Sequence, residues 1–145
     1  MKALIQRVKS ASVSINQELY SKIDKGILIF LGVEKDDTET QADWLANKIS
    51  KLRIFEDENE KMNLSVEDIN GEILIVSQFT LAGDCKKGTR PSFDNAKNPE
   101  DANKLYEYFT SKMQETGLMV KTGVFRAMMD IELINDGPVT FLIEK

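Results

Sequence analysis

The sequence predicts a single α+β domain, with two helices packed on a largely antiparallel sheet or open β-barrel. The 145 residues are the length of one domain, so we assign residues 1–145 to one unit. Short apolar or alternating runs near both ends of the chain have the period of strands. Two segments between them have helical spacing. No repeat, linker or low-complexity segment interrupts this order. Strands with a small number of helices packed on them are typical of the α+β class.

The first strands are expected before residue 34. Residues 3–8 are short and partly apolar, and residues 11–15 alternate, with Val13 and Ile15 on one face. A polar turn at residues 16–18 precedes a strand through Tyr20. Residues 27–33 are continuously apolar, which is typical of a strand buried on both faces. We expect these strands to form a meander.

The first helix is predicted over residues 38–52. Asp37 or Thr38 can cap its first turn, and Glu39 complements the positive end of the helix dipole. Apolar residues at helical spacing predict one buried stripe, which consists of Trp44, Leu45, Ile49 and Leu52.

The second helix has the clearest signals in the chain. Asn98 is its expected cap, Pro99 occupies the first helical position, and Gly117 ends it. Its predicted buried face consists of Leu105, Tyr108, Phe109 and Met113. The remaining strands are predicted at residues 72–81, 119–125, 129–134 and 139–143, with a turn at residues 135–137 before the last.

Composition excludes several classes of function. The formal net charge is −5, whereas proteins that grip nucleic acid along its backbone usually present a basic face. The chain has no histidine, which excludes Ser-His-Asp and Cys-His catalysis and histidine-containing zinc sites. Cys85 is the only cysteine, so no internal disulfide can form. We expect no metal and no cofactor. Without a membrane-length apolar run or a signal-peptide core, a cytoplasmic location is expected.

Two segments carry polar or rigid residues at unusual places. Ser77, Gln78 and Thr80 follow an aliphatic strand, and buried polar groups there must be satisfied or used. The alternative is ordinary polarity at a strand end. Gly137 and Pro138 form either a plain turn or a rigid corner that presents backbone carbonyls to a ligand.

A basic loop lies between these segments. Residues 84–97 hold four basic and two acidic side chains, a local charge of +2 in an acidic chain. Such a loop beside a site could contact phosphates, although solvated surface lysines are the simpler explanation.

Taken together and in order, these segments resemble one family. The chain resembles the D-aminoacyl-tRNA deacylases of the bacterial and eukaryotic type, and the resemblance covers essentially its whole length. The two signature segments are residues 77–81, Ser-Gln-Phe-Thr-Leu, and residues 135–140, Asn-Asp-Gly-Pro-Val-Thr. Further matches lie at residues 5–8, 11–13, 32–37, 51–55, 61–64, 90–93 and 122–123.

The resemblance implies an activity and an assembly. The family hydrolyses the ester between a D-amino acid and the 3′-terminal adenosine of tRNA, and it removes glycine from mischarged tRNA. Its members are homodimers with the site at the subunit interface. Gly137 and Pro138 would then be joined by a cis bond and reach into the partner's pocket, where their carbonyls bind the amino group and exclude L side chains. Arg7 matches the residue that braces this corner, and Phe125 and Met129 match pocket walls.

The resemblance places the catalytic segment at Ser77, Gln78, Phe79 and Thr80. Backbone N–H groups of Phe79 and Thr80 are candidate oxyanion donors. The ribose 2′-OH of the substrate could relay the proton, whereas a nucleophilic Thr80 would need a base that the sequence does not offer. Arg126 stands where the family usually has a small residue, so it alters the pocket rim or forms a surface salt bridge.

Two other functions remain open from the sequence. One is a non-catalytic module that binds the acceptor end of tRNA. The other is an esterase for small D-amino acid derivatives, which would act without the body of the tRNA.

Overall fold

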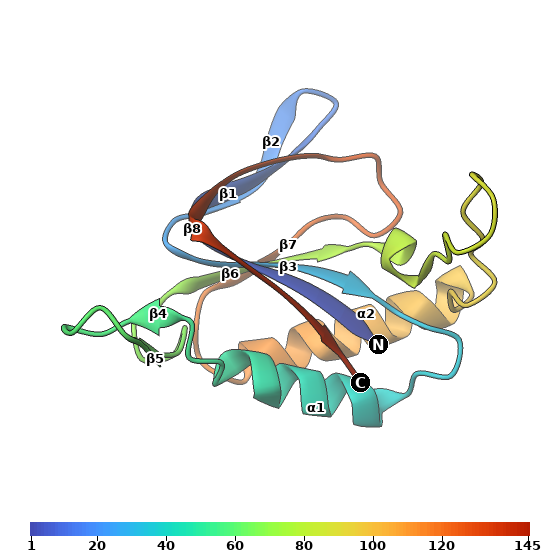
Figure 1. Cartoon of the computed structure of the whole chain (residues 1–145). Coiled ribbons are helices and arrows are strands. Elements are labelled where there is room, and N and C mark those ends of the chain that lie inside the picture. Colours follow the sequence, from blue (N-terminus) through green and yellow to red (C-terminus); the bar gives the residue numbers. More distant parts are fainter.

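The computed structural model describes residues 1–145 and contains eight strands, two α-helices and one 3-10 helix, η1 (Figure 1). The strands are β1 (Lys2–Ile15), β2 (Glu18–Ile23), β3 (Gly26–Gly32), β4 (Phe55–Glu56), β5 (Met62–Leu64), β6 (Glu72–Ser77), β7 (Val120–Thr122) and β8 (Asp130–Glu144). The helices are α1 (Glu39–Ser50), η1 (Phe79–Ala82) and α2 (Pro99–Gln114).

The main sheet is mixed and largely antiparallel, which confirms the predicted class. Strand β1 pairs antiparallel with β2, β3 and β8, while β3, β6 and β7 are parallel neighbours. The predicted meander is wrong. β2 and β3 follow one another along β1, from Ile15 opposite Glu18 to Lys2 opposite Gly32, and make one long hairpin. The chain reverses only at Asn16 and Gln17, whose positive φ angles suit a tight hairpin turn.

Strand β8 replaces the two separate strands that the sequence predicts near the end of the chain. It runs beside β1 over almost its whole length, and the register shifts between Asn135, opposite Val8, and Thr140, opposite Gln6. The predicted turn at residues 135–137 is therefore part of a bulge within one strand. Extra residues in one strand of an antiparallel pair bend it away from its partner, which here leaves Gly137 and Pro138 exposed.

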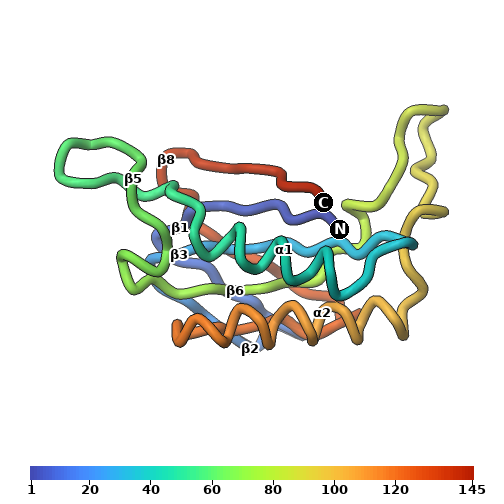
Figure 2. Tube along the Cα trace, turned by 90° about the horizontal axis from the view of Figure 1, so that it is seen from below, coloured from blue at the N-terminus to red at the C-terminus, as the bar shows by residue number.

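Both helices lie side by side on one face of the sheet (Figures 1 and 2). The crossovers β3–α1–β6 and β6–α2–β7 advance in the same direction across the sheet, so crossovers of the same hand place both helices on the same side. The larger core fills this layer and includes Ile29, Ile75, Leu45 and Phe109. A second cluster, including Val13, Leu28 and Leu74, lies on the other face, where β1 and β2 curl over.

The N-terminal caps agree with the predictions, but α2 ends at Gln114 rather than at Gly117, and two predicted core residues are wrong. The Gln41 side chain accepts a hydrogen bond from the Thr38 amide, and the Asn98 side chain accepts one from the Asp101 amide. Trp44 is 38% exposed because it lies on the flank of α1, where the Lys145 ammonium covers its ring. On α2, Tyr106 is buried in the core, and Tyr108 instead lies on the flank and donates to Asp43.

Candidate active site

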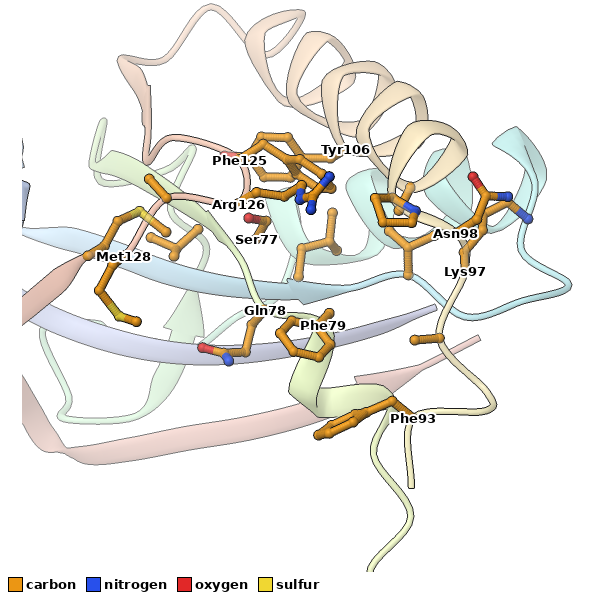
Figure 3. Close-up of a pocket in the computed structure, with 18 of the residues that line it drawn as sticks. Ser77, Gln78, Phe79, Phe93, Lys97, Asn98, Tyr106, Phe125, Arg126 and Met128 are labelled. Atoms are coloured by element: carbon orange, nitrogen blue, oxygen red, sulfur yellow. The ribbon is translucent and has the colours of Figure 1, made fainter. Parts of the chain in front are cut away.

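A pocket of about 790 Å³ opens where β6 ends (Figure 3). One wall is the end of β6, a second is the start of α2, and the third is the turn after β7. Its polar or aromatic lining residues include Ser77, Gln78, Phe79, Phe93, Lys97, Asn98, Tyr106, Phe125 and Arg126. Predominantly apolar concave sites of this size are typical of small-molecule binding.

The Ser77–Thr80 segment turns out of the sheet at this pocket. Strand β6 stops at Ser77, and Phe79 begins η1, so the expectation of a strand through residue 81 is wrong. The turn brings the Gln78 amide to the Thr80 hydroxyl, to which it donates a hydrogen bond. Ser77, Gln78 and Phe79 line the pocket, whereas Thr80 is exposed outside it.

The deep wall of the pocket is aromatic. The rings of Tyr106 and Phe125 pack with centroids 5.8 Å apart, and the Tyr106 hydroxyl donates to the Ile75 carbonyl at 2.9 Å. Burial raises the pKa of the Tyr106 phenol, so this group stays protonated and cannot act as a base near neutral pH. Met129 completes the wall, and its sulfur accepts from the Val124 amide. The structure thus brings Phe125 and Met129 to the same pocket as Ser77.

No carboxylate, thiol or hydroxyl base lines the pocket, apart from the hydroxyl of Ser77 and the phenol of Tyr106. Its charged lining groups are the cations Lys97 and Arg126. The Lys97 ammonium donates to the backbone carbonyls of Lys35 and Asp37, which fixes it at the rim. Arg126 is exposed with a φ of 63°, and it makes no ion pair, so the surface salt bridge considered for it is absent.

The Gly137–Pro138 corner is held from below by a buried arginine. Arg7 is 4% exposed and donates through Nε to the Asp136 carbonyl at 2.8 Å and through Nη1 to the Ile54 carbonyl at 2.7 Å. The Gly137–Pro138 peptide bond is cis, and the φ of Gly137 is 143°. A Cβ on Gly137 would lie 2.7 Å from Val139 Cγ2, so only glycine fits without a shift.

Within one chain, this corner does not reach the pocket. Arg7 pairs with Ile27 at the start of β3, and Ile27 pairs with Ile73 of β6. Ser77 lies four residues further along β6, which corresponds to about 13 Å at 3.3 Å per residue. None of Arg7, Gly137 and Pro138 lines the pocket. The predicted site residues therefore fall into two groups at different ends of the sheet.

The sequence does not mark four polar or aromatic pocket residues as site residues. Phe93 stands out only through the family match and Lys97 and Asn98 only as parts of a loop and a helix cap, while Tyr106 is not singled out at all. The available signal was topological, because a ligand site commonly lies where parallel strands end and helices begin. No cluster of Asp, Glu or Cys side chains in the chain could hold a metal ion. No helix is long and apolar enough to cross a membrane.

The comparisons with known proteins agree with the two signature segments. The sequence profile described as D-Tyr-tRNA(Tyr) deacylase matches residues 4–144. The chain belongs to this family. Membership makes it a deacylase, an enzyme that hydrolyses an ester bond.

Curated relatives match over nearly the full length of the chain. A protein of Geotalea daltonii named D-aminoacyl-tRNA deacylase is 59% identical over 144 residues, which cover 99% of this chain and 96% of that protein. Its namesake from Thermotoga petrophila is 56% identical, with 99% and 97% covered.

Two solved structures share the fold of the chain. One, titled c-Myc DNA Unwinding Element Binding Protein, is 42% identical with a TM-score of 0.95, and the match covers 100% of this chain and 99% of that one. A probable eukaryotic D-amino acid tRNA deacylase has a TM-score of 0.87 at 17% identity, covering 98% and 97%, so this match supports the fold alone.

Proposed function

We propose that this chain hydrolyses the ester of D-aminoacyl-tRNA, releasing the free amino acid and tRNA in the cytoplasm. The observation that carries the proposal is the pocket beside Ser77–Thr80, in a chain that belongs to the D-Tyr-tRNA(Tyr) deacylase family over residues 4–144. Its relatives bear that activity in their names. Misacylated glycyl-tRNA is a second substrate, since glycine has no side chain for a chiral filter to reject.

The chemistry of the pocket favours catalysis by the substrate itself. An aminoacyl ester is activated, so its hydrolysis depends on the placement of water and on stabilisation of the oxyanion. The amides of Phe79 and Thr80 are in the first turn of η1, where no residue of that helix accepts from them. They serve as oxyanion donors, with Ser77 and Gln78 holding the ester beside them. Because no lining carboxylate can accept a proton, the ribose 2′-OH relays it.

Chiral selection requires a second copy of the chain. The Gly137–Pro138 corner is exposed and held by Arg7, yet it lies away from the pocket of its own chain. In a homodimer with the site at the interface, the corner of one protomer enters the pocket of its partner. Its carbonyls bind the amino group of the substrate, and its bulk excludes L side chains.

Release of D-tyrosine and L-tyrosine from charged tRNA, measured with chelator present, tests the activity. We expect rapid loss of the D-ester with the L-ester intact. Loss of neither ester would favour the non-catalytic binding module. Loss of both would contradict the proposed filter. Rapid hydrolysis of small D-amino acid esters at the tRNA rate would favour a general esterase.

Mixing two variants tests the shared site. Ala127→Trp fills the pocket and leaves the corner intact, while Gly137→Ala displaces the corner and leaves the pocket intact. Each variant alone should lose D-specific hydrolysis, and mixed dimers should regain it because one of their two sites combines both intact parts. Gly117→Ala is the matched control for a glycine at positive φ outside the corner. Activity equal to the sum of the two parents would refute a site built from two chains.

A further inference from the structure

The loop over residues 84–97, here named the basic arm, is the largest feature at the pocket mouth that the proposed chemistry leaves unused. It projects away from the body of the molecule beyond η1 (Figure 1), and Phe93, Ala96 and Lys97 of the loop line the pocket. Asp84 and Ser92 exchange two backbone hydrogen bonds of 2.8 and 2.9 Å, which close the tip as a small hairpin. Below the tip, the backbone N–H of Lys35 donates to the Asn95 carbonyl, and the backbone N–H of Lys97 donates to the Val33 carbonyl. The base of the arm is therefore fixed to the core, beside the pocket.

The tip carries cations that have no partner in the protein. Lys86, Lys87 and Arg90 are exposed, and none of them is in an ion pair. Residues 84–97 have a net charge of +2. Because the whole chain has a net charge of −5, its other residues together carry −7. An acidic protein that gathers unpaired cations on one arm attracts a polyanion there and repels it elsewhere.

An aromatic pair joins the arm to the pocket. The rings of Phe79 and Phe93 lie 5.0 Å apart at 55°, and both line the mouth (Figure 3). They are 61% and 39% exposed, which is unusual for phenylalanine. Phe93 is seated against Gly83, where a Cβ would lie 3.0 Å from its ring. Exposed rings beside a cationic track are the arrangement with which proteins bind single-stranded nucleic acid, by stacking bases and contacting phosphates.

We propose that the basic arm binds the single-stranded nucleotides that precede the terminal adenosine of the substrate RNA. Lys86, Lys87 and Arg90 contact their phosphates, and Phe93 with Phe79 provides the stacking surface for a base. The inference rests on the proposed function for the identity of the RNA. It adds a separate binding subsite, which contributes affinity for the RNA and takes no part in ester cleavage.

The test compares two substrates with the variant Lys86→Gln/Lys87→Gln/Arg90→Gln. One substrate is D-tyrosyl-tRNA, and the other is the D-tyrosyl ester of adenosine, which has no preceding phosphate. The variant should lose about tenfold or more in kcat/KM on the tRNA, mainly through KM, because phosphate contacts add uniform binding. On the adenosine ester it should stay within about twofold of the parent. The slope of log kcat/KM against log salt should become shallower by about 2, at 0.7 per contact on a single strand.

A matched control removes the same charge elsewhere. Lys48, Lys51 and Arg53 surround a separate pocket at the C-terminal end of α1, and Lys48→Gln/Lys51→Gln/Arg53→Gln should leave kcat/KM on both substrates within about twofold. Equal losses in the two triple variants would attribute the effect to net charge and overturn the proposal. An unchanged rate in the arm variant, or equal losses on tRNA and adenosine ester, would also overturn it.

Direct binding separates this inference from the proposed function. Affinity for an uncharged RNA hairpin with a single-stranded 3′ end, measured by fluorescence anisotropy, should fall in the arm variant and be kept in the control. Phe93→Leu keeps an apolar anchor against Gly83 but lacks a planar ring, and it should weaken binding about fivefold or more. If neither ester is cleaved but the arm variant still loses affinity, the enzymatic proposal fails and the subsite remains. If the affinity is unchanged, the subsite is refuted.

Discussion

The pocket and the Gly137–Pro138 corner are built on opposite principles. The pocket is an apolar hollow with a cationic rim, open enough for a ligand to enter and without a carboxylate to act on it. The corner is an exposed bend held by a buried cation beneath it, Arg7, and by the Asn135 side chain, which hydrogen-bonds to Val139 across the bend. The pocket supplies space and the corner supplies rigidity. The two regions lie apart in one chain, and the following variants test each half of the contrast.

The corner should be the more fragile of the two regions. Arg7→Leu removes both hydrogen bonds and leaves the Ile54 and Asp136 carbonyls without their donor, so it should lower the free energy of unfolding by about 2–4 kcal/mol. Urea denaturation measures this loss, and the D/L preference should fall with it. Arg7→Lys keeps the charge but cannot span both carbonyls, so it should give an intermediate result. A variant as stable and as selective as the parent would show that the corner keeps its conformation without Arg7.

The pocket wall should depend on Tyr106 for stability rather than for chemistry. Tyr106→Phe loses the hydrogen bond to Ile75, which also accepts from Gly123, so we expect a cost of about 1 kcal/mol and unchanged turnover. A large loss of kcat at unchanged stability would instead make the phenol a catalytic group.

The same residue predicts a pH dependence. Burial raises the pKa of Tyr106 above its ordinary value of 10.0. At a pH between the pKa of the unfolded chain and the higher pKa of the folded chain, the unfolded chain has therefore lost a proton that the folded chain retains. The contribution of this group is complete below pH 10 and is lost as the pH rises further. Thermal melts from pH 8 to 11 should show the parent losing stability at the alkaline end, and Tyr106→Phe should lose less.

Thr80 should show the smallest effect. Its hydroxyl accepts from Gln78 and lies outside the pocket, so Thr80→Val should keep kcat/KM within about threefold. Removal of a covalent nucleophile would cost about a thousandfold or more. Single-turnover hydrolysis of the D-ester distinguishes these outcomes, and a loss of the second size would restore the nucleophile hypothesis.

Local signals predicted the elements well and their connections less well. The start of a helix at Asn98 and Pro99 depends on residues close in sequence, and so does the strand in the apolar run at residues 27–33. Both predictions are confirmed. The separate final strands and the meander were wrong because pairing is decided by distant partners. Only the neighbouring β1, with Arg7 beneath the bulge, makes residues 130–144 one strand.

The site shows the same limit. Ser77, Gln78 and Phe79 stand out because polarity follows an aliphatic strand, and the structure places them on a pocket. Tyr106 has no such mark, since a tyrosine on a helix can lie in the core or on the flank. Tyr108 fits the helical spacing of the predicted buried face better, yet it lies on the flank of α2.

The pairing of β1 with β8 has a consequence for how the chain is made. Strand β1 finds its partner in β8, far along the chain, and Lys2 pairs with Glu144. Contacts so distant in sequence form slowly, and one edge of β1 stays open until β8 has been synthesised. A nascent chain therefore carries an unsatisfied strand edge while the residues between β1 and β8 are made, and a premature stop before β8 would leave that edge free for aggregation.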